Sequence, residues 1–155
     1  MAITPDDDRP TDPARLAREA AVQLLFQADL NPDLPASAAK TTLEDLLPDG
    51  PARRRAWRLF AGTREVRDEL DAKLSGVARN WSLKRMAATD RNVLRLGLFE
   101  LLHTDAPPKV VLDEAIELAR TFGSKNSPGF VNGLLDRLLP EQGKPGGGPD
   151  AGTPG

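Results

Sequence analysis

The 155-residue chain contains no cysteine and a single histidine. Without cysteine it can form no disulfide, no thiolate zinc site and no cysteine nucleophile. The histidine, His103, falls late in a leucine-rich helical pattern, where a side chain that can carry positive charge is favourable, so we interpret it as a helix-end residue. The motifs Gly-x-Ser-x-Gly, His-Glu-x-x-His and Gly-x-Gly-x-x-Gly are also missing. These absences argue against an enzyme and predict neither a metal nor a cofactor.

Long apolar runs are missing as well. No stretch approaches the roughly 18 residues that span a bilayer. The N-terminal sequence MAITPDDDRP is acidic and has no apolar core, so it does not read as a secretory signal. We therefore expect no membrane association and a cytoplasmic location.

Carboxylates cluster in one place, at Asp113, Glu114 and Glu117. Asp113 and Glu117 are four residues apart on a predicted solvent face, in the first half of a helix, where acidic side chains suit the helix dipole. We interpret this cluster as a solvated helix face rather than an acid–base or metal site.

The charge is unevenly distributed along the chain. The net charge is only −2, but residues 1–50 carry −6, residues 51–95 carry +7 and residues 96–155 carry −3. The positive charge is therefore concentrated in the middle of the chain. It is compatible with solvated helix faces as well as with a binding surface.

Helical patterns account for the chain between its ends, with no alternating strand pattern. Asp12 and Pro13 predict a helix start, and Asn31-Pro32 predicts its end. Thr89 is predicted to cap a later helix, and Gly123 to end the next one. Further helices are expected over 37–47, 51–75 and 128–139, with a short turn or helix opening at Trp81. About seven helices with short connections indicate an all-α fold.

The two ends of the chain have a different composition. Residues 1–10 are rich in Asp and Pro, and residues 141–155 are rich in Gly and Pro. Both are predicted to be disordered tails. Residues 11–140 are expected to form one helical domain.

Two short stretches have the residue types that hold single-stranded RNA. Arg15 and Arg18 share a face of the first helix, and Gln23 and Phe26 continue it at helical spacing. The second stretch, Lys125-Asn126-Ser127, lies at the start of the last helix, where free backbone N–H groups favour anions. Phe130 follows in the first turn. Cations, polar groups and rings in this combination are typical of RNA-binding surfaces.

Three segments together resemble the NusB family of bacterial transcription antitermination proteins. They are ARLAREAAVQLLFQ, DRNVLRLGLFEL and PPKVVLDEAIELARTFGSKNSPGFVNGLLDRLL, and the resemblance runs from about residue 13 to 139. It implies an all-helical fold of two small packed subdomains and a non-catalytic role. It also implies two partners: boxA, a single-stranded element in nascent RNA, and NusE, a small-subunit ribosomal protein. With them the protein would join the RNA polymerase antitermination complex, chiefly in ribosomal RNA operons.

The resemblance also assigns residues. Arg15 and Arg18 match the basic start of the family's first helix, although Ala14 and Leu16 stand where further basic residues are common. Phe130 matches the phenylalanine on the family's RNA face, which implies that its ring is displayed. Asp90 stands where an acidic residue is associated with the NusE interface. The resemblance thus implies RNA binding by a first helix with fewer arginines than is common in the family. It also implies partner binding through Asp90. The implied RNA-binding set is Arg15, Arg18, Gln23, Phe26, Lys125, Asn126, Ser127 and Phe130.

Two alternatives stay open. A similar helical domain occurs fused ahead of a ribosomal RNA cytosine methyltransferase, but after Leu139 this sequence has only its Gly/Pro-rich tail. The chain could instead be a structural helical homodimer whose interface hides the RNA face. Family members include monomers and dimers, and the sequence does not decide between them.

Overall fold

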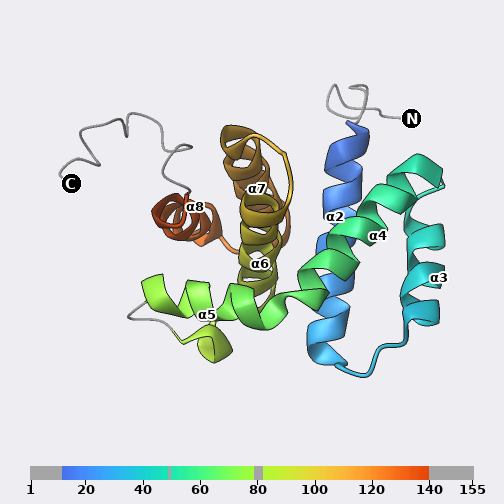
Figure 1. Ribbon diagram of the computed structural model, residues 1–155, viewed down its shortest axis with the longest axis horizontal. Helices are drawn as coiled ribbons and strands as arrows, with labels where there is room; N and C mark the ends of the chain where they lie inside the picture. The colour runs from blue at the N-terminus through green and yellow to red at the C-terminus, as the bar shows by residue number, and fades with distance from the viewer. Residues whose placement is uncertain (1–11, 49, 79–81, 140–155) are drawn as a thin grey trace.

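The computed structural model describes residues 12–48, 50–78 and 82–139, and within these ranges it contains helices and no strand (Figure 1). This confirms the predicted all-α class with about seven helices. The elements are α2 (Pro13–Leu30), α3 (Ala36–Leu46), α4 (Gly50–Glu65), α5 (Arg67–Val77), the 3-10 turn η1 (Leu83–Arg85), α6 (Ala88–His103), α7 (Pro108–Phe122) and α8 (Ser127–Arg137). The predicted disordered tails lie outside the described residues, as does Trp81.

Local chemistry explains most helix ends. The carboxylate of Asp12 accepts a hydrogen bond from the backbone N–H of Ala14 at 3.0 Å, and Pro13 occupies the first helical position, as predicted. Gly123 ends α7, again as predicted. A Cβ atom there would lie 2.4 Å from the Ser127 hydroxyl oxygen, so the junction needs glycine. Thr89 is not the cap of α6, because the helix begins at Ala88 and Ala87 occupies the cap position.

The predicted single helix over 51–75 is wrong, because the chain turns at Val66 and forms two helices, α4 and α5. The charge sequence is consistent with the break. Arg64 occupies the last turn of α4, and Asp68 and Glu69 occupy the first turn of α5, which suits the two opposed helix dipoles. The turn aims α5 across the molecule, and Leu70 becomes fully buried there.

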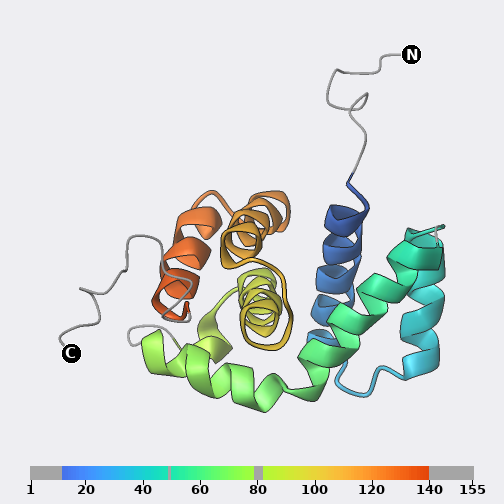
Figure 2. The same cartoon turned by 45° about the horizontal axis from the view of Figure 1, so that its top comes forward.

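The helices form two groups joined through α6. Helices α2, α3 and α4 pack together on one side, and α5 to α8 pack on the other (Figures 1 and 2). Helix α6 contacts α2, α4, α5, α7 and α8, so it is enclosed by neighbours. Nearly every residue from Asn92 to Leu101 is buried. Gly62 of α4 allows the close approach to α6, since a Cβ there would lie 2.4 Å from the Phe99 ring.

Polar side chains inside this assembly are paired. The Asp29 carboxylate, at the end of α2, accepts hydrogen bonds from Arg91 at 2.7 and 2.9 Å and from Asn92 at 3.0 Å. Arg95, one turn further along α6, forms a two-pronged pair with Asp71 of α5 at 2.7 and 2.9 Å. Buried charges are tolerated when their hydrogen bonds are satisfied. These contacts fix α6 to both groups of helices.

The pKa of Asp29 is lowered by this environment. Burial alone would raise it, but the hydrogen bonds from Arg91 and Asn92 and the charges of Arg91 and Arg95 outweigh burial. A carboxyl group whose pKa is lower in the folded state stabilises the fold above its unfolded pKa of about 3.9. That contribution is lost as the pH falls through the folded pKa.

We therefore expect Asp29→Asn to reduce the free energy of unfolding by about 1–3 kcal/mol at pH 7, the usual worth of hydrogen bonds to a charged group. The difference from the native chain should shrink as the pH is lowered below about 4. Denaturant titrations at several pH values measure it. Asp113→Asn, at an exposed i,i+4 pair with Lys109, is the control and should change little. A difference that persists unchanged at low pH would contradict the assignment.

Candidate nucleic-acid interface

Three of the predicted residues of α2 lie on its accessible side. Gln23 is exposed, and Arg15 and Phe26 are half-buried. Glu19 lies between Arg15 and Gln23 at helical spacing and was not predicted as part of this face. Burial raises the pKa of Glu19, the charge of Arg15 opposes the rise, and Glu114 adds to it. This face of α2 therefore offers a cation, an amide and a ring with a carboxylate among them.

Arg18 is not part of that face, so the prediction of an exposed arginine pair is wrong. Its side chain is only 4% exposed and forms a two-pronged pair with Glu100 of α6 at 2.8 and 2.9 Å. The physical reason is the helical repeat. Arg18 lies on the side of α2 that carries Val22 and Leu25 into the core, whereas Arg15 begins the neighbouring stripe. The guanidinium of Arg18 ties α2 to α6.

Arg15 remains at the surface, but it has a protein partner. Its guanidinium donates two hydrogen bonds to the Glu114 carboxylate of α7, at 3.0 and 2.9 Å. The hydrogen bond and charge of Glu114 raise the pKa of Arg15 above its usual range. The Arg15 side chain is 41% exposed, so it can still be reached from solvent. A phosphate at this position would have to share Arg15 with Glu114.

The junction between α7 and α8 contains the second predicted group. Lys125 and Asn126 are exposed, but Ser127 is buried, and its hydroxyl oxygen accepts a hydrogen bond from the backbone N–H of Ser124 at 2.9 Å. Ser127 therefore uses its hydroxyl oxygen within the junction, although the residue also lines the cavity beside Phe130. The Ser127 hydroxyl thus satisfies a backbone donor of the junction, three residues before it.

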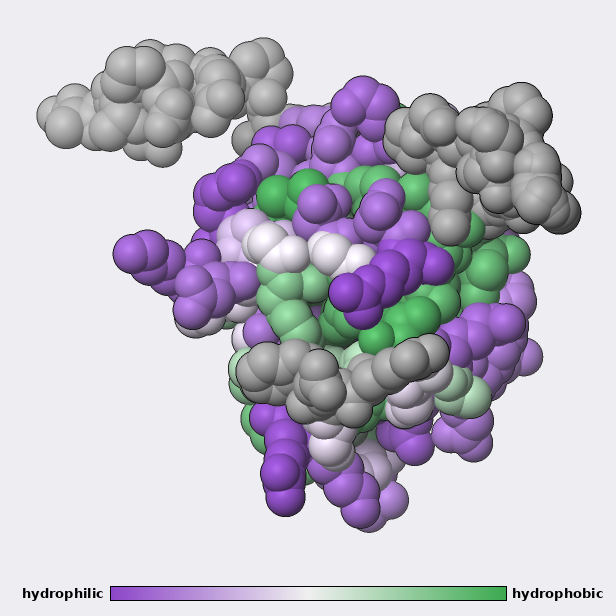
Figure 3. Space-filling model, turned by 90° about the vertical axis from the view of Figure 1, so that its left-hand side faces the viewer, coloured by the Kyte–Doolittle hydropathy of each residue, from purple (hydrophilic) through white to green (hydrophobic). Residues whose placement is uncertain are grey.

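Phe130 lies at the edge of the core and on a surface cavity. Its ring is half-buried and packs against the hydrophobic core, while Val131, Leu134 and Leu135 of the same helix are buried. The ring implied to be displayed therefore also takes part in packing. The ring also lines a cavity of about 300 Å³. The space-filling view of the α5 and α8 side shows hydrophobic surface between polar side chains (Figure 3).

This cavity joins residues that the sequence had assigned to different partners. Its wall includes Phe130 and Asn126, predicted to bind RNA, and Asp90, predicted to bind the partner protein. One carboxylate oxygen of Asp90 is buried without a hydrogen-bond partner in the part of the chain that the structure describes. Arg85 of η1 also lines the cavity and is exposed. Sequence reasoning missed Arg85, although it lies in the basic middle of the chain.

The C-terminal half of α2 and the α7–α8 junction are both linked to the start of α6. Asp29, one turn after Phe26, is bound by Arg91 and Asn92, which directly follow Asp90 of the cavity wall. The start of α6 thus holds the end of α2 through hydrogen bonds and meets the α7–α8 junction across the cavity.

The remaining candidates do not converge on a catalytic centre. His103 is exposed, lies 3.1 Å from Glu69 and stacks on the Phe99 ring at 5.6 Å. The three clustered carboxylates, Asp113, Glu114 and Glu117, each face a different cation. No group of three or more potential ligands for a metal occurs among the described residues. None of the described helices is long and apolar enough to cross a membrane.

Comparisons with known proteins show which family this chain resembles. A family model described as the NusB family matches residues 15–140. The transcription antitermination protein NusB of Geobacter sulfurreducens is 40% identical over 134 residues, which cover 83% of this chain and 97% of that protein. A solved structure of T. maritima NusB is 38% identical, with a TM-score of 0.72, and covers 84% of this chain and 92% of its own.

A second solved structure is described as the antitermination factors NusB and NusE in complex with dsRNA. The matching chain is 25% identical to this one, with a TM-score of 0.72, and the match covers 81% of this chain and 95% of that chain. The similarity therefore extends over nearly all of the described helices.

The buried position of Arg18 leads to a stability prediction. Arg18→Met should lower the free energy of unfolding by about 3–5 kcal/mol, because Glu100 would be left charged and unpaired inside the protein. Arg18→Met/Glu100→Leu should recover much of the loss, since an apolar pair can replace a buried ion pair at little cost. Chemical denaturation of the three chains measures both effects. If Arg18→Met keeps the native denaturation midpoint and instead weakens RNA binding, Arg18 would contact RNA as the sequence predicted.

Proposed function

The chain belongs to the NusB family, and we propose that it is a transcription antitermination protein that binds boxA RNA together with NusE. The complex would promote read-through by RNA polymerase, chiefly in ribosomal RNA operons. The observation that carries this proposal is the cavity at the start of α6, which holds Asp90 beside Asn126 and Phe130. A site of this kind can contact RNA and a protein at once.

We propose that the RNA lies along the accessible face of α2 and over the start of α8. Arg15 and Lys125 supply positive charge to phosphates, while Gln23 and Asn126 offer amides to base edges. The rings of Phe26 and Phe130 can each support a base. Arg18 and Ser127 are left out of this set because both are buried.

The partner protein is expected to contact Asp90. A buried carboxylate oxygen without a partner is costly, so a hydrogen-bond donor brought by NusE would be favourable there. RNA seated on Phe130 and a protein seated on Asp90 would then share one cavity. Each would bind more tightly in the presence of the other.

The same proposal includes a non-catalytic role and a cytoplasmic site of action. The non-catalytic role is supported by the separate pairing of the clustered carboxylates. It is also supported by the exposed position of His103 at the end of its helix. We further propose that residues 11–140 act as one RNA-binding domain flanked by tails.

We expect the chain alone to bind boxA RNA weakly and NusE to tighten the binding. On this surface Arg15 is shared with Glu114, and Glu19 adds negative charge, so few phosphates can be neutralised. Titrations of labelled RNA with and without NusE measure the effect. The slope of log affinity against log salt should be shallow for the chain alone. Equal affinity in both titrations would contradict the proposal.

Phe130→Ala separates a stacking role from a packing role. RNA binding should weaken by about 1–3 kcal/mol, the usual worth of a base–aromatic stack. The half-buried ring should cost clearly less stability than the roughly 3–5 kcal/mol of a fully buried phenylalanine. RNA affinity and the denaturation midpoint are measured on the same variant. His103→Ala is the control and should change neither. A large fall in the midpoint with unchanged affinity of the folded fraction would refute stacking.

A further inference from the structure

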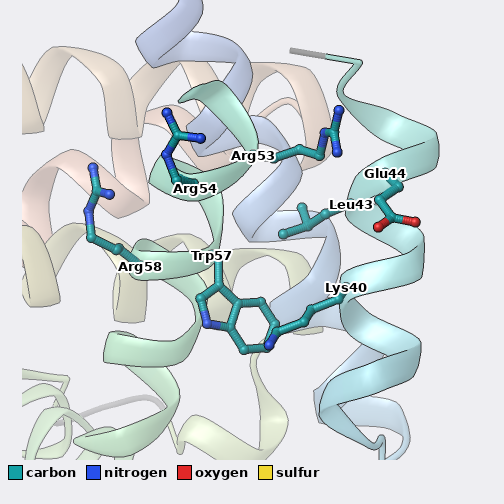
Figure 4. Close-up of a pocket in the computed structure, with 7 residues that line it drawn as sticks. All are labelled: Lys40, Leu43, Glu44, Arg53, Arg54, Trp57 and Arg58. Carbon is teal, nitrogen blue, oxygen red and sulfur yellow. The ribbon is translucent and has the colours of Figure 1, made fainter. Parts of the chain in front are cut away.

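A second hollow, of about 420 Å³, lies between α3 and α4, away from the α6 cavity (Figure 4). Trp57 and Leu43 form its apolar floor, and one acidic residue, Glu44, lies on its rim. In the close-up, Lys40 reaches from α3 to the indole ring, and Arg53 extends from α4 toward α3. The cations that line the hollow are Lys40, Arg53, Arg54 and Arg58.

Two arginines of this hollow have no carboxylate partner, unlike several arginines elsewhere in the fold. Arg15, Arg18, Arg91, Arg95 and Arg120 are each paired with a carboxylate. Arg54 and Arg58 are exposed, and neither forms a hydrogen bond or an ion pair with any residue in the described ranges. They are four residues apart on α4 and therefore neighbours on its surface. Within the described residues, these two guanidinium groups therefore stay free of partners near the ring of Trp57.

Trp57 is held in place but remains accessible. It is half-buried, and its ring lies 5.6 Å from the buried ring of Phe60 in a tilted arrangement. The Lys40 ammonium lies 4.9 Å from the centroid of the indole ring. A cation–π contact at an exposed site is weak, whereas a base stacked on an aromatic ring contributes more. A base can therefore displace Lys40, which becomes free to meet a phosphate.

We propose that this hollow is a second contact site for single-stranded RNA, separate from the α2–α8 surface and indifferent to sequence. One base stacks on Trp57, and Arg54, Arg58 and Lys40 contact the backbone phosphates on either side. The choice of RNA rests on the proposed function. The geometry itself is that of a stacking platform within a positive groove, which binds single strands without reading bases.

The site can extend beyond one nucleotide. Arg58 also lines a neighbouring cavity of about 390 Å³ between α4 and α6, together with Arg55 and the half-buried ring of Phe99. A strand leaving Trp57 would therefore meet a further cation and a further ring, with the carboxylate of Asp105 on the same cavity wall. An acidic peptide would satisfy the arginines but would gain nothing from the indole, so RNA fits the whole surface better.

Trp57 fluorescence tests the proposal directly. The chain has two tryptophans, so Trp81→Phe leaves Trp57 as the only one. A short oligouridylate should quench this fluorescence, with an affinity that falls as salt is raised. In Arg54→Gln/Arg58→Gln the affinity should fall roughly tenfold or more, and the salt slope should flatten by about 1.4, for two single-strand phosphates. Arg67→Gln/Lys73→Gln, on α5, removes the same charge and should bind normally.

Anisotropy of a labelled oligouridylate with the unaltered chain provides a second measurement that needs no change at Trp81. Three results would overturn the proposal: no quenching and no anisotropy change, quenching that survives Arg54→Gln/Arg58→Gln, or equal binding and quenching by polyglutamate. The last would indicate an acidic protein partner instead.

The two RNA sites can be distinguished. The α4 variants should leave the affinity for a minimal boxA RNA in the presence of NusE unchanged, and Phe130→Ala should leave the oligouridylate quenching of Trp57 unchanged. Loss of boxA binding in the α4 variants would show that the two surfaces form one RNA site, and it would refute the inference of a separate one. A failure of boxA binding with intact Trp57 quenching would refute the proposed function alone.

Discussion

The ion pair between Arg18 and Glu100 fixes how the first described helix lies against the central one. Both side chains are at most 5% exposed, and each satisfies the other with two hydrogen bonds. A two-pronged pair between a planar guanidinium and a carboxylate tolerates few relative orientations. The pair therefore sets the rotation of α2. That rotation decides that Arg15, Gln23 and Phe26 are accessible while Arg18 is not.

The same logic operates at the other end of α2. Asp29 accepts hydrogen bonds from Arg91 and Asn92, so the end of α2 is fixed beside the start of α6. Asp90 precedes these residues and lines the cavity with Phe130. The geometry of these hydrogen bonds relates the two helices to each other, although apolar residues could replace such a network at little cost in stability. Its consequence for function is that the RNA-facing ring of α8 and the carboxylate proposed for NusE share one cavity.

Periodicity was sufficient to predict the all-α class. Most helix ends could be predicted as well, because Asp12, Asn31-Pro32 and Gly123 act on backbone only a few residues away in sequence. The break at Val66 was missed because apolar spacing continues through it, and only the charge change from Arg64 to Asp68 signals it. The burial of Arg18 could not be predicted, since its partner Glu100 is 82 residues away. Trp57 lies half-buried on a hollow, because α3 covers only part of α4.

The central claim is that RNA crosses the accessible face of α2 and the start of α8 while NusE occupies the neighbouring Asp90. Photo-crosslinking tests it most directly, with 4-thiouridine placed along a boxA RNA in the complex of this chain and NusE. Crosslinked residues are identified by mass spectrometry. We predict crosslinks at Phe26 and Phe130, on two helices that no single stretch of sequence connects. Crosslinks confined to α3, α4 and α5, with α2 and α8 free of them, would contradict the account.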